Sequence, residues 1–90
     1  MTKVRIPPTL RNEVGGEREL IGAGETVREV LEDLSVRYPA LEAQLFEGGG
    51  LAPFVNVYVG GEDIRTRNGY ETPVSDGETV ILLPAMAGGT

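Results

Sequence analysis

The chain has no cysteine and no histidine, and these two absences exclude several kinds of chemistry. Without them there is no disulfide framework, no thiolate nucleophile, no imidazole base, and no zinc or iron–sulfur site of the usual Cys/His kind. Lysine is also scarce, because Lys3 is the single one and arginines supply the other positive charges. The chain therefore offers few acceptor amines and lacks the thiol and imidazole groups of nucleophilic catalysis.

Positive charge and long apolar runs are scarce as well. The 14 acidic residues against 8 basic ones give a net charge of −6, which repels the phosphates of nucleic acids and anionic lipids. The longest apolar stretch, Val80 to Ala87, contains Pro84 and is far shorter than the roughly 20 residues that span a bilayer. The first residues, Met1 to Arg5, lack the apolar core of a secretory signal. We expect a cytoplasmic protein with neither a nucleic-acid nor a membrane partner.

The 90 residues are enough for one compact domain and too few for two separate cores. Alternating apolar residues, turn glycines and one capped apolar stripe predict its elements. In chain order they are strands at 3–6 and 17–21, a helix from Thr26 to Tyr38, and strands at 54–59, 63–65 and 78–83. This order predicts an α+β domain over residues 1–84, with one mixed sheet packed on a single main helix, and a flexible tail at 85–90.

The connections have signals of their own. Gly15-Gly16 is expected to form a tight hairpin, and residues 47–50 an exposed loop. A short helical turn is expected over residues 41–46, and on the main helix we expect ion pairs Arg28–Glu32 and Asp33–Arg37. In the strand at 54–59, the polar residue Asn56 is in phase with Phe54 and Tyr58, so the core-facing residues are predicted to be Val55, Val57 and Val59.

Two candidate sites are weak. Gly22-Ala23-Gly24 before the helix resembles the start of a phosphate-binding loop, but Val27 stands where a third glycine belongs and Glu25 repels phosphate. We interpret this segment as a plain turn from strand to helix. The many carboxylates do not converge as acid–base catalysis requires, and are interpreted as solvated surface.

The last eight residues, Leu83 to Thr90, are the most informative segment. The Gly88-Gly89 pair follows the last strand and connects it to no further element. A frayed terminus is one explanation. The other is an extended tail that inserts into a partner protein. Pro84 to Gly89 can extend roughly 20 Å, and small uncharged residues can enter a narrow channel on a partner. A carboxylate at its end would need activation by an ATP-dependent enzyme.

The ordered set of these features resembles the ubiquitin-like β-grasp sulfur-carrier proteins over nearly the whole chain. That group contains the small subunit of molybdopterin synthase and the thiamin-pathway and cysteine-pathway carriers. The residues that carry the resemblance are Val4–Thr9, the Gly15-Gly16 hairpin, Thr26–Pro39, Phe54–Val59, Glu62–Arg65, Asp76-Gly77 and Leu83–Gly89. The longer middle of this chain looks most like the cysteine-biosynthesis carrier and less like the thiamin carrier.

The resemblance implies a carrier that is a substrate and not an enzyme, with no cofactor of its own. An E1-like adenylyltransferase and sulfurtransferase would use ATP to activate the terminal glycine and convert it to a thiocarboxylate. In the cysteine pathway the sulfur would go to a cysteine synthase that uses pyridoxal phosphate, and a metalloprotease would then release the new cysteine. In the molybdopterin pathway the partner would be the large subunit of molybdopterin synthase.

Position by position, the resemblance makes Gly89 the residue that carries the adenylate or thiocarboxylate. The partner-binding residues would be Leu83, Pro84, Ala85, Met86, Ala87 and Gly88. Leu83 corresponds to the exposed apolar residue that packs on the activating enzyme, and ordinary packing within the sheet is the alternative for it. The family ends in glycine, whereas this chain has Thr90 after Gly89. We expect either that a protease removes Thr90 or that it is an addition to the natural chain.

Two other functions stay open on the sequence. The chain can be a ubiquitin-like modifier conjugated to lysines of target proteins. It can also be a binding module that works through the sheet face near Phe54 and Tyr58, in which case the residues after Ala87 would be dispensable.

Overall fold

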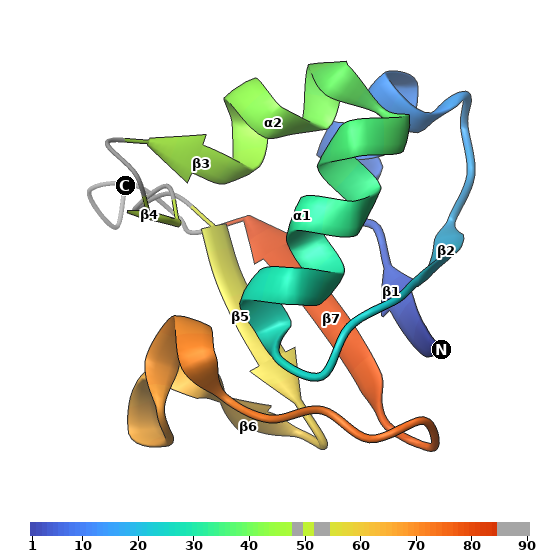
Figure 1. Ribbon diagram of the computed structural model, residues 1–90. Coiled ribbons are helices and arrows are strands. Elements are labelled where there is room, and N and C mark those ends of the chain that lie inside the picture. Colours follow the sequence, from blue (N-terminus) through green and yellow to red (C-terminus); the bar gives the residue numbers. More distant parts are fainter. Residues whose placement is uncertain (48–49, 52–54, 85–90) are drawn as a thin grey trace.

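The computed structural model describes residues 1–47, 50–51 and 55–84. A five-stranded sheet has the order β2-β1-β7-β5-β6. Its strands are β1 (Thr2–Arg5), β2 (Glu19–Gly22), β5 (Val55–Val59), β6 (Glu62–Asp63) and β7 (Thr79–Pro84). The two central strands, β1 and β7, are parallel, and every other neighbouring pair is antiparallel. Helix α1 (Val27–Arg37) crosses one face of this sheet (Figure 1). The predicted mixed sheet on one main helix is confirmed.

The core lies between α1 and the inner face of the sheet. Alternation along the strands sends every second side chain inward, as expected for a sheet with one face in water. Val57 and Val59 are buried as predicted, whereas Val55 is only partly buried at the strand's start. The residues that meet there are Val4 of β1, Val80 and Leu82 of β7, and Val27, Val30, Leu31 and Leu34 of α1.

The ends of α1 follow the sequence signals closely. Thr26 is the N-cap, and its hydroxyl oxygen accepts a hydrogen bond from the Glu29 backbone N–H at 3.2 Å. The Glu29 carboxylate accepts from the N–H of Glu25 at 2.8 Å, one residue before the position that a capping box uses. The predicted pair between Asp33 and Arg37 forms at 2.9 Å. Arg28, expected to pair with Glu32, instead pairs with Glu71, which the fold brings to the helix's first turn.

Helix α2 (Pro39–Leu45) follows α1 directly, and its Leu41 and Leu45 are fully buried. The predicted short helical turn is thus confirmed, with Pro39 at its first position. The expected loop at residues 47–50 is wrong in part, because β3 (Phe46–Glu47) pairs with β4 (Gly50–Leu51) in a separate two-stranded sheet. Phe46 stabilises this region by an edge-to-face contact with Tyr70, with ring centroids 5.8 Å apart.

Two local predictions need correction. The β1–β2 connection is no tight hairpin: residues 8–14 form a 3₁₀ segment whose Leu10 and Val14 are buried, and Gly15 ends it with a positive φ of 69°. The connection between β1 and β2 is therefore packed against the core through these two side chains. The strand expected at 63–65 stops at Asp63, because the Asp63 carboxylate accepts the Arg65 backbone N–H at 2.8 Å and starts a 3₁₀ turn.

Candidate functional site

The exposed end of β7 is the part of the predicted site that the structure describes. Leu82 is 1% exposed and lies in the core, whereas Leu83 points to the other face and keeps 43% of its surface exposed. The backbone of Pro84 still pairs with Val55 in the sheet. The remaining predicted site residues, Ala85, Met86, Ala87, Gly88 and Gly89, lie outside the described residues, as does Thr90.

The sheet supplies the neighbours of Leu83 on its outer face. Leu83 lies opposite Asn56 of β5, and Ile81, two residues earlier on the same face, lies opposite Tyr58. On the other side Ile81 is in register with Arg5 of β1. The outer face therefore presents two aliphatic residues of β7 between polar and aromatic neighbours. Such a surface suits contact with another protein better than contact with water alone.

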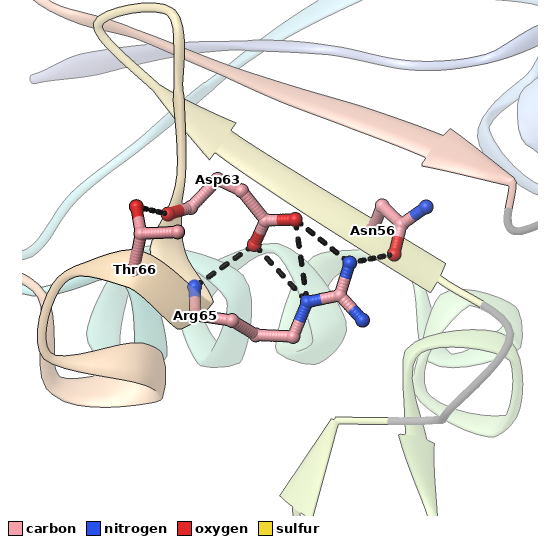
Figure 2. Close-up of polar contacts among 4 residues, drawn as sticks. All are labelled: Asn56, Asp63, Arg65 and Thr66. Carbon is pink, nitrogen blue, oxygen red and sulfur yellow. Dashed lines mark hydrogen bonds and ion pairs between the residues drawn. The ribbon is translucent and has the colours of Figure 1, made fainter.

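A hydrogen-bonded group fixes the β5–β6 side of this surface (Figure 2). Arg65 pairs with the Asp63 carboxylate at 2.7 Å through Nη2, and the same nitrogen donates to Oδ1 of Asn56 at 2.9 Å. The Thr66 hydroxyl donates to the backbone oxygen of Asp63 at 2.7 Å. Two short elements, β6 and the 3₁₀ turn after it, thereby hold the guanidinium beside the residue that lies opposite Leu83.

The electrostatics of this group are those of a stable ion pair. The Arg65 side chain, and next its backbone N–H, lower the pKa of the Asp63 carboxyl. The Asp63 carboxylate in turn raises the pKa of Arg65. Both groups therefore keep their charge through the neutral range, and neither is a proton donor or acceptor for catalysis. The contact between Asp63 and Arg65 was not predicted from the sequence. The signal for it was the spacing of an aspartate and an arginine two residues apart.

The glycine turn before α1 is structural, as interpreted from the sequence. A Cβ on Gly22 would lie 2.7 Å from Cγ1 of Val30, and one on Gly24 would lie 2.6 Å from Cβ of Glu29. These glycines allow strand and helix to approach closely. The backbone N–H of Ala23 donates to the Asp33 carboxylate at 3.0 Å, so a side chain of the helix already occupies the donor that a phosphate would use.

The acidic side chains of the described part of the chain do not form a metal site. Across residues 1–47, 50–51 and 55–84, no three acidic side chains gather in a way that could hold a metal ion. The Asp33 carboxylate has a lowered pKa, mainly because it accepts from the Ala23 N–H, and next because Arg37 lies beside it. Its role is to tie α1 to the preceding turn. Within the same residues, no helix is long and apolar enough to cross a membrane.

Comparison with known proteins places the chain in a family. The family model described as the ThiS family matches residues 4–89, nearly the whole chain. The chain belongs to the ThiS family. In sequence it is 39% identical over 89 residues to the sulfur carrier protein CysO of Mycobacterium tuberculosis, with 96% of each chain covered. It is 34% identical over 90 residues to the small archaeal modifier protein 3 of Haloferax volcanii, with 97% of each covered.

The fold of this ThiS-family chain agrees with that placement. A chain of the Amycolatopsis orientalis BexX/CysO complex superposes with a TM-score of 0.90 at 42% identity, covering 99% of this chain and 100% of that one. The resemblance to ubiquitin-like β-grasp carriers, inferred from the order of the sequence motifs, is thus confirmed for the family and for the fold. The family match also includes Gly88 and Gly89.

Proposed function

We propose that this chain is a sulfur carrier that holds sulfur as a thiocarboxylate on Gly89, after removal of Thr90. The observation that carries the proposal is the 39% identity to a protein named as a sulfur carrier, over 96% of both chains. The ThiS-family match ends at Gly89 itself, which supports assigning the carrier role to that residue. A carboxylate as the sulfur-bearing group also agrees with a chain that contains no cysteine.

The chemistry needs a partner enzyme because a carboxylate is a poor electrophile. In the first step a carboxylate oxygen of Gly89 attacks the α-phosphorus of ATP, and diphosphate leaves. In the second step a hydrosulfide ion supplied by the partner attacks the acyl carbon, AMP leaves with the bonding electron pair, and loss of the sulfur proton leaves the thiocarboxylate. The chain supplies the acyl group, and an E1-like adenylyltransferase supplies the nucleotide site and the sulfur. The chain is therefore a substrate and not an enzyme.

The described residues contribute a docking surface for that enzyme. Leu83 is the exposed aliphatic residue directly before the segment that would enter the partner's channel. Burying the 43% of this side chain that is still exposed would contribute roughly 0.6 to 1.3 kcal/mol to an interface. Asn56 and Arg65 are held beside it by hydrogen bonds, so the surface is ordered before binding and loses little entropy in the complex. In this proposal the residues from Pro84 to Gly88 line the path to the reacting carboxylate.

The relatives favour one destination for the sulfur. The similarity to CysO favours donation in cysteine biosynthesis, with a cysteine synthase that uses pyridoxal phosphate as the acceptor enzyme and a metalloprotease acting on the tail. Donation to the large subunit of molybdopterin synthase is the alternative within the same chemistry. Both destinations use the same thiocarboxylate on Gly89.

A second candidate function is conjugation to other proteins. It is favoured by the 34% identity to a small archaeal modifier protein over nearly the full length of both chains. In that function the activated Gly89 would form an isopeptide bond with a lysine of a target protein. Because Lys3 is the only lysine of this chain, polymers of the modifier linked through lysine would not branch.

The intact mass of the chain, purified from its own cells under conditions that preserve thiocarboxylates, tests the proposal. Loss of one threonine residue and exchange of one oxygen for sulfur are the expected changes. The control is a chain lacking Gly89 and Thr90, which should show no exchange. A chain that keeps Thr90 and all its oxygen under sulfur demand would contradict the carrier function. Isopeptide adducts on target lysines would support the modifier function.

A further inference from the structure

The eight basic residues of this acidic protein divide into two groups along the chain. Residues 1–21 contain four basic and three acidic side chains, whereas residues 22–90 contain four basic and eleven acidic ones. Each basic residue of the later group is in an ion pair: Arg28 with Glu71, Arg37 with Asp33, Arg65 with Asp63 and Arg67 with Glu62. Among the described residues, the basic side chains without an ion pair therefore all lie near the N-terminus.

Of the early basic residues, only Arg5 has an acidic partner within the described part of the chain. It meets Glu19 at 3.9 Å, a separation similar to that of Arg67 and Glu62. Among the residues that the structure describes, Lys3, Arg11 and Arg18 are in no ion pair. Arg11 instead donates through Nε to the backbone oxygen of Ile6 at 3.1 Å, which holds its position but leaves its charge uncompensated. Charged groups left in this state can pair with charges supplied by another molecule.

Three of these arginines line one open cavity of about 540 Å³ between the end of β1, the start of β2 and the 3₁₀ segment. Its lining residues are Arg5, Arg11, Gly16, Glu17, Arg18 and Glu19. Backbone hydrogen bonds shape its walls, since the Ile6 N–H donates to the Arg18 oxygen at 2.8 Å and the Gly16 N–H donates to the Arg11 oxygen at 2.7 Å. The backbone around the cavity is therefore held by the fold, and the charged side chains complete its lining.

The cavity adjoins the exposed end of β7. Arg5 and Ile81 are in register on the parallel strands β1 and β7, whose separation in a sheet is about 4.8 Å. Because Val4 and Val80 are buried, Arg5 and Ile81 point to the same outer face, and Leu83 follows two residues later on that face. A protein that packs on Leu83 would thus lie within reach of the arginine-lined cavity.

The charges of the lining identify the kind of ligand. Glu17 and Glu19 repel a free phosphate or a nucleic acid, and the net charge of −6 adds to that repulsion. A partner protein can instead supply a carboxylate that pairs with a guanidinium of the cavity. A cation next to that carboxylate on the partner can at the same time pair with a glutamate of the cavity. We propose that this cavity is the charged docking site for an acidic patch on the protein that activates the C-terminal tail. This inference rests on the proposed function, because that function requires such a partner.

The test compares two double variants of the chain ending at Gly89. Arg5→Gln with Arg18→Gln removes two charges from the cavity, and Arg28→Gln with Arg67→Gln removes two charges elsewhere. The readout is kcat/KM for ATP–pyrophosphate exchange by the E1-like enzyme of the same organism. At low salt we expect the cavity variant to lose about tenfold and the control less than about twofold. Rising salt should narrow the difference, because the Debye length shortens.

Three results would contradict the proposed docking site. Equal losses in the two variants, or a difference that salt does not change, would overturn the docking site while leaving the carrier function in place. No exchange with the unmodified trimmed chain would refute the proposed function and this inference with it. Binding of inorganic phosphate at Arg5 and Arg18 by NMR, with kcat/KM unchanged in the cavity variant, would assign the cavity to a small anion instead. Urea denaturation of both variants verifies that they are folded.

Discussion

Alanine substitution at Leu82 should mainly lower the free energy of unfolding. The same substitution at its neighbour Leu83 should cost less stability and should also lower the rate of activation by the partner enzyme. Leu82 is 1% exposed, and truncating a leucine in such a site costs about 2–5 kcal/mol through lost transfer energy and the cavity left behind. Leu83 is 43% exposed, so within the free chain it has only about 0.9–1.7 kcal/mol of the roughly 1.5–3 kcal/mol that full burial of a leucine contributes. The two adjacent positions thus form a matched pair on opposite faces of one strand.

The total stability expected for this chain makes that difference measurable. At roughly 0.05–0.15 kcal/mol per residue, 90 residues have a free energy of unfolding of about 5–13 kcal/mol. Leu82→Ala therefore removes a large fraction of it, with a shift of about 4–8 °C in Tm for each kcal/mol. For Leu83→Ala we also expect a loss in activation of about 3- to 9-fold in kcat/KM for adenylation, because the partner would bury only the 43% of the side chain that is still exposed, worth about 0.6–1.3 kcal/mol.

Urea denaturation followed by circular dichroism measures the first quantity, and ATP–pyrophosphate exchange with the trimmed chain measures the second. The assignment of faces requires that the two variants separate in both assays. Equal changes in the free energy of unfolding would mean that Leu83 is packed as deeply as Leu82. Full activity of the Leu83→Ala chain would show that the activating enzyme does not use this side chain, and Leu83 would then be ordinary sheet packing.

Two further predictions concern packing and pH. Gly24→Ala should destabilise the domain by about 2 kcal/mol or more, because the new Cβ would lie 2.6 Å from the Cβ of Glu29 and 2.7 Å from the Val30 nitrogen. Gly77→Ala is the control: a Cβ there would lie in open space, so thermal stability should change little. Burial raises the pKa of Tyr70 from 10.0 to about 12, so the folded chain holds this proton more tightly and stability should fall as pH rises from 10 toward 12. Tyrosinate absorbance, with Tyr70→Phe to assign the step, measures that shift; ionisation near pH 10 in the folded chain would contradict it.

Local signals in the sequence were sufficient for the main elements. The stripe from Val27 to Leu34 predicted α1, and Thr26 predicted where it begins, because a hydroxyl N-cap acts only on the next few residues. The alternation at Val57 and Val59 predicted the buried face of β5 for the same reason. The family resemblance supplied the β-grasp arrangement of these elements, which periodicity alone does not specify.

The errors arose where a distant contact overrode a local preference. Arg28 is four residues from Glu32, a suitable partner on its own helix, yet it pairs with Glu71, which lies 43 residues further along the chain. The Gly15-Gly16 pair has the positive φ angles of a hairpin, but burial of Leu10 and Val14 makes the connection a 3₁₀ segment held against the core. Neither contact has a signal within a window of a few residues.

The sequence by itself determined the class of the chain, the chemistry it lacks, the position and facing of its main helix and strands, and the Gly88-Gly89 pair, which lies within the ThiS-family match. These depend on composition, on short-range periodicity and on motif order, all of which are properties of the linear chain. Only the tertiary structure placed Arg5 beside Ile81 and gathered Arg11 and Arg18 around one cavity. That placement depends on the pairing of β1 with β7, strands from opposite ends of the chain, whose register is set by burial in the common core.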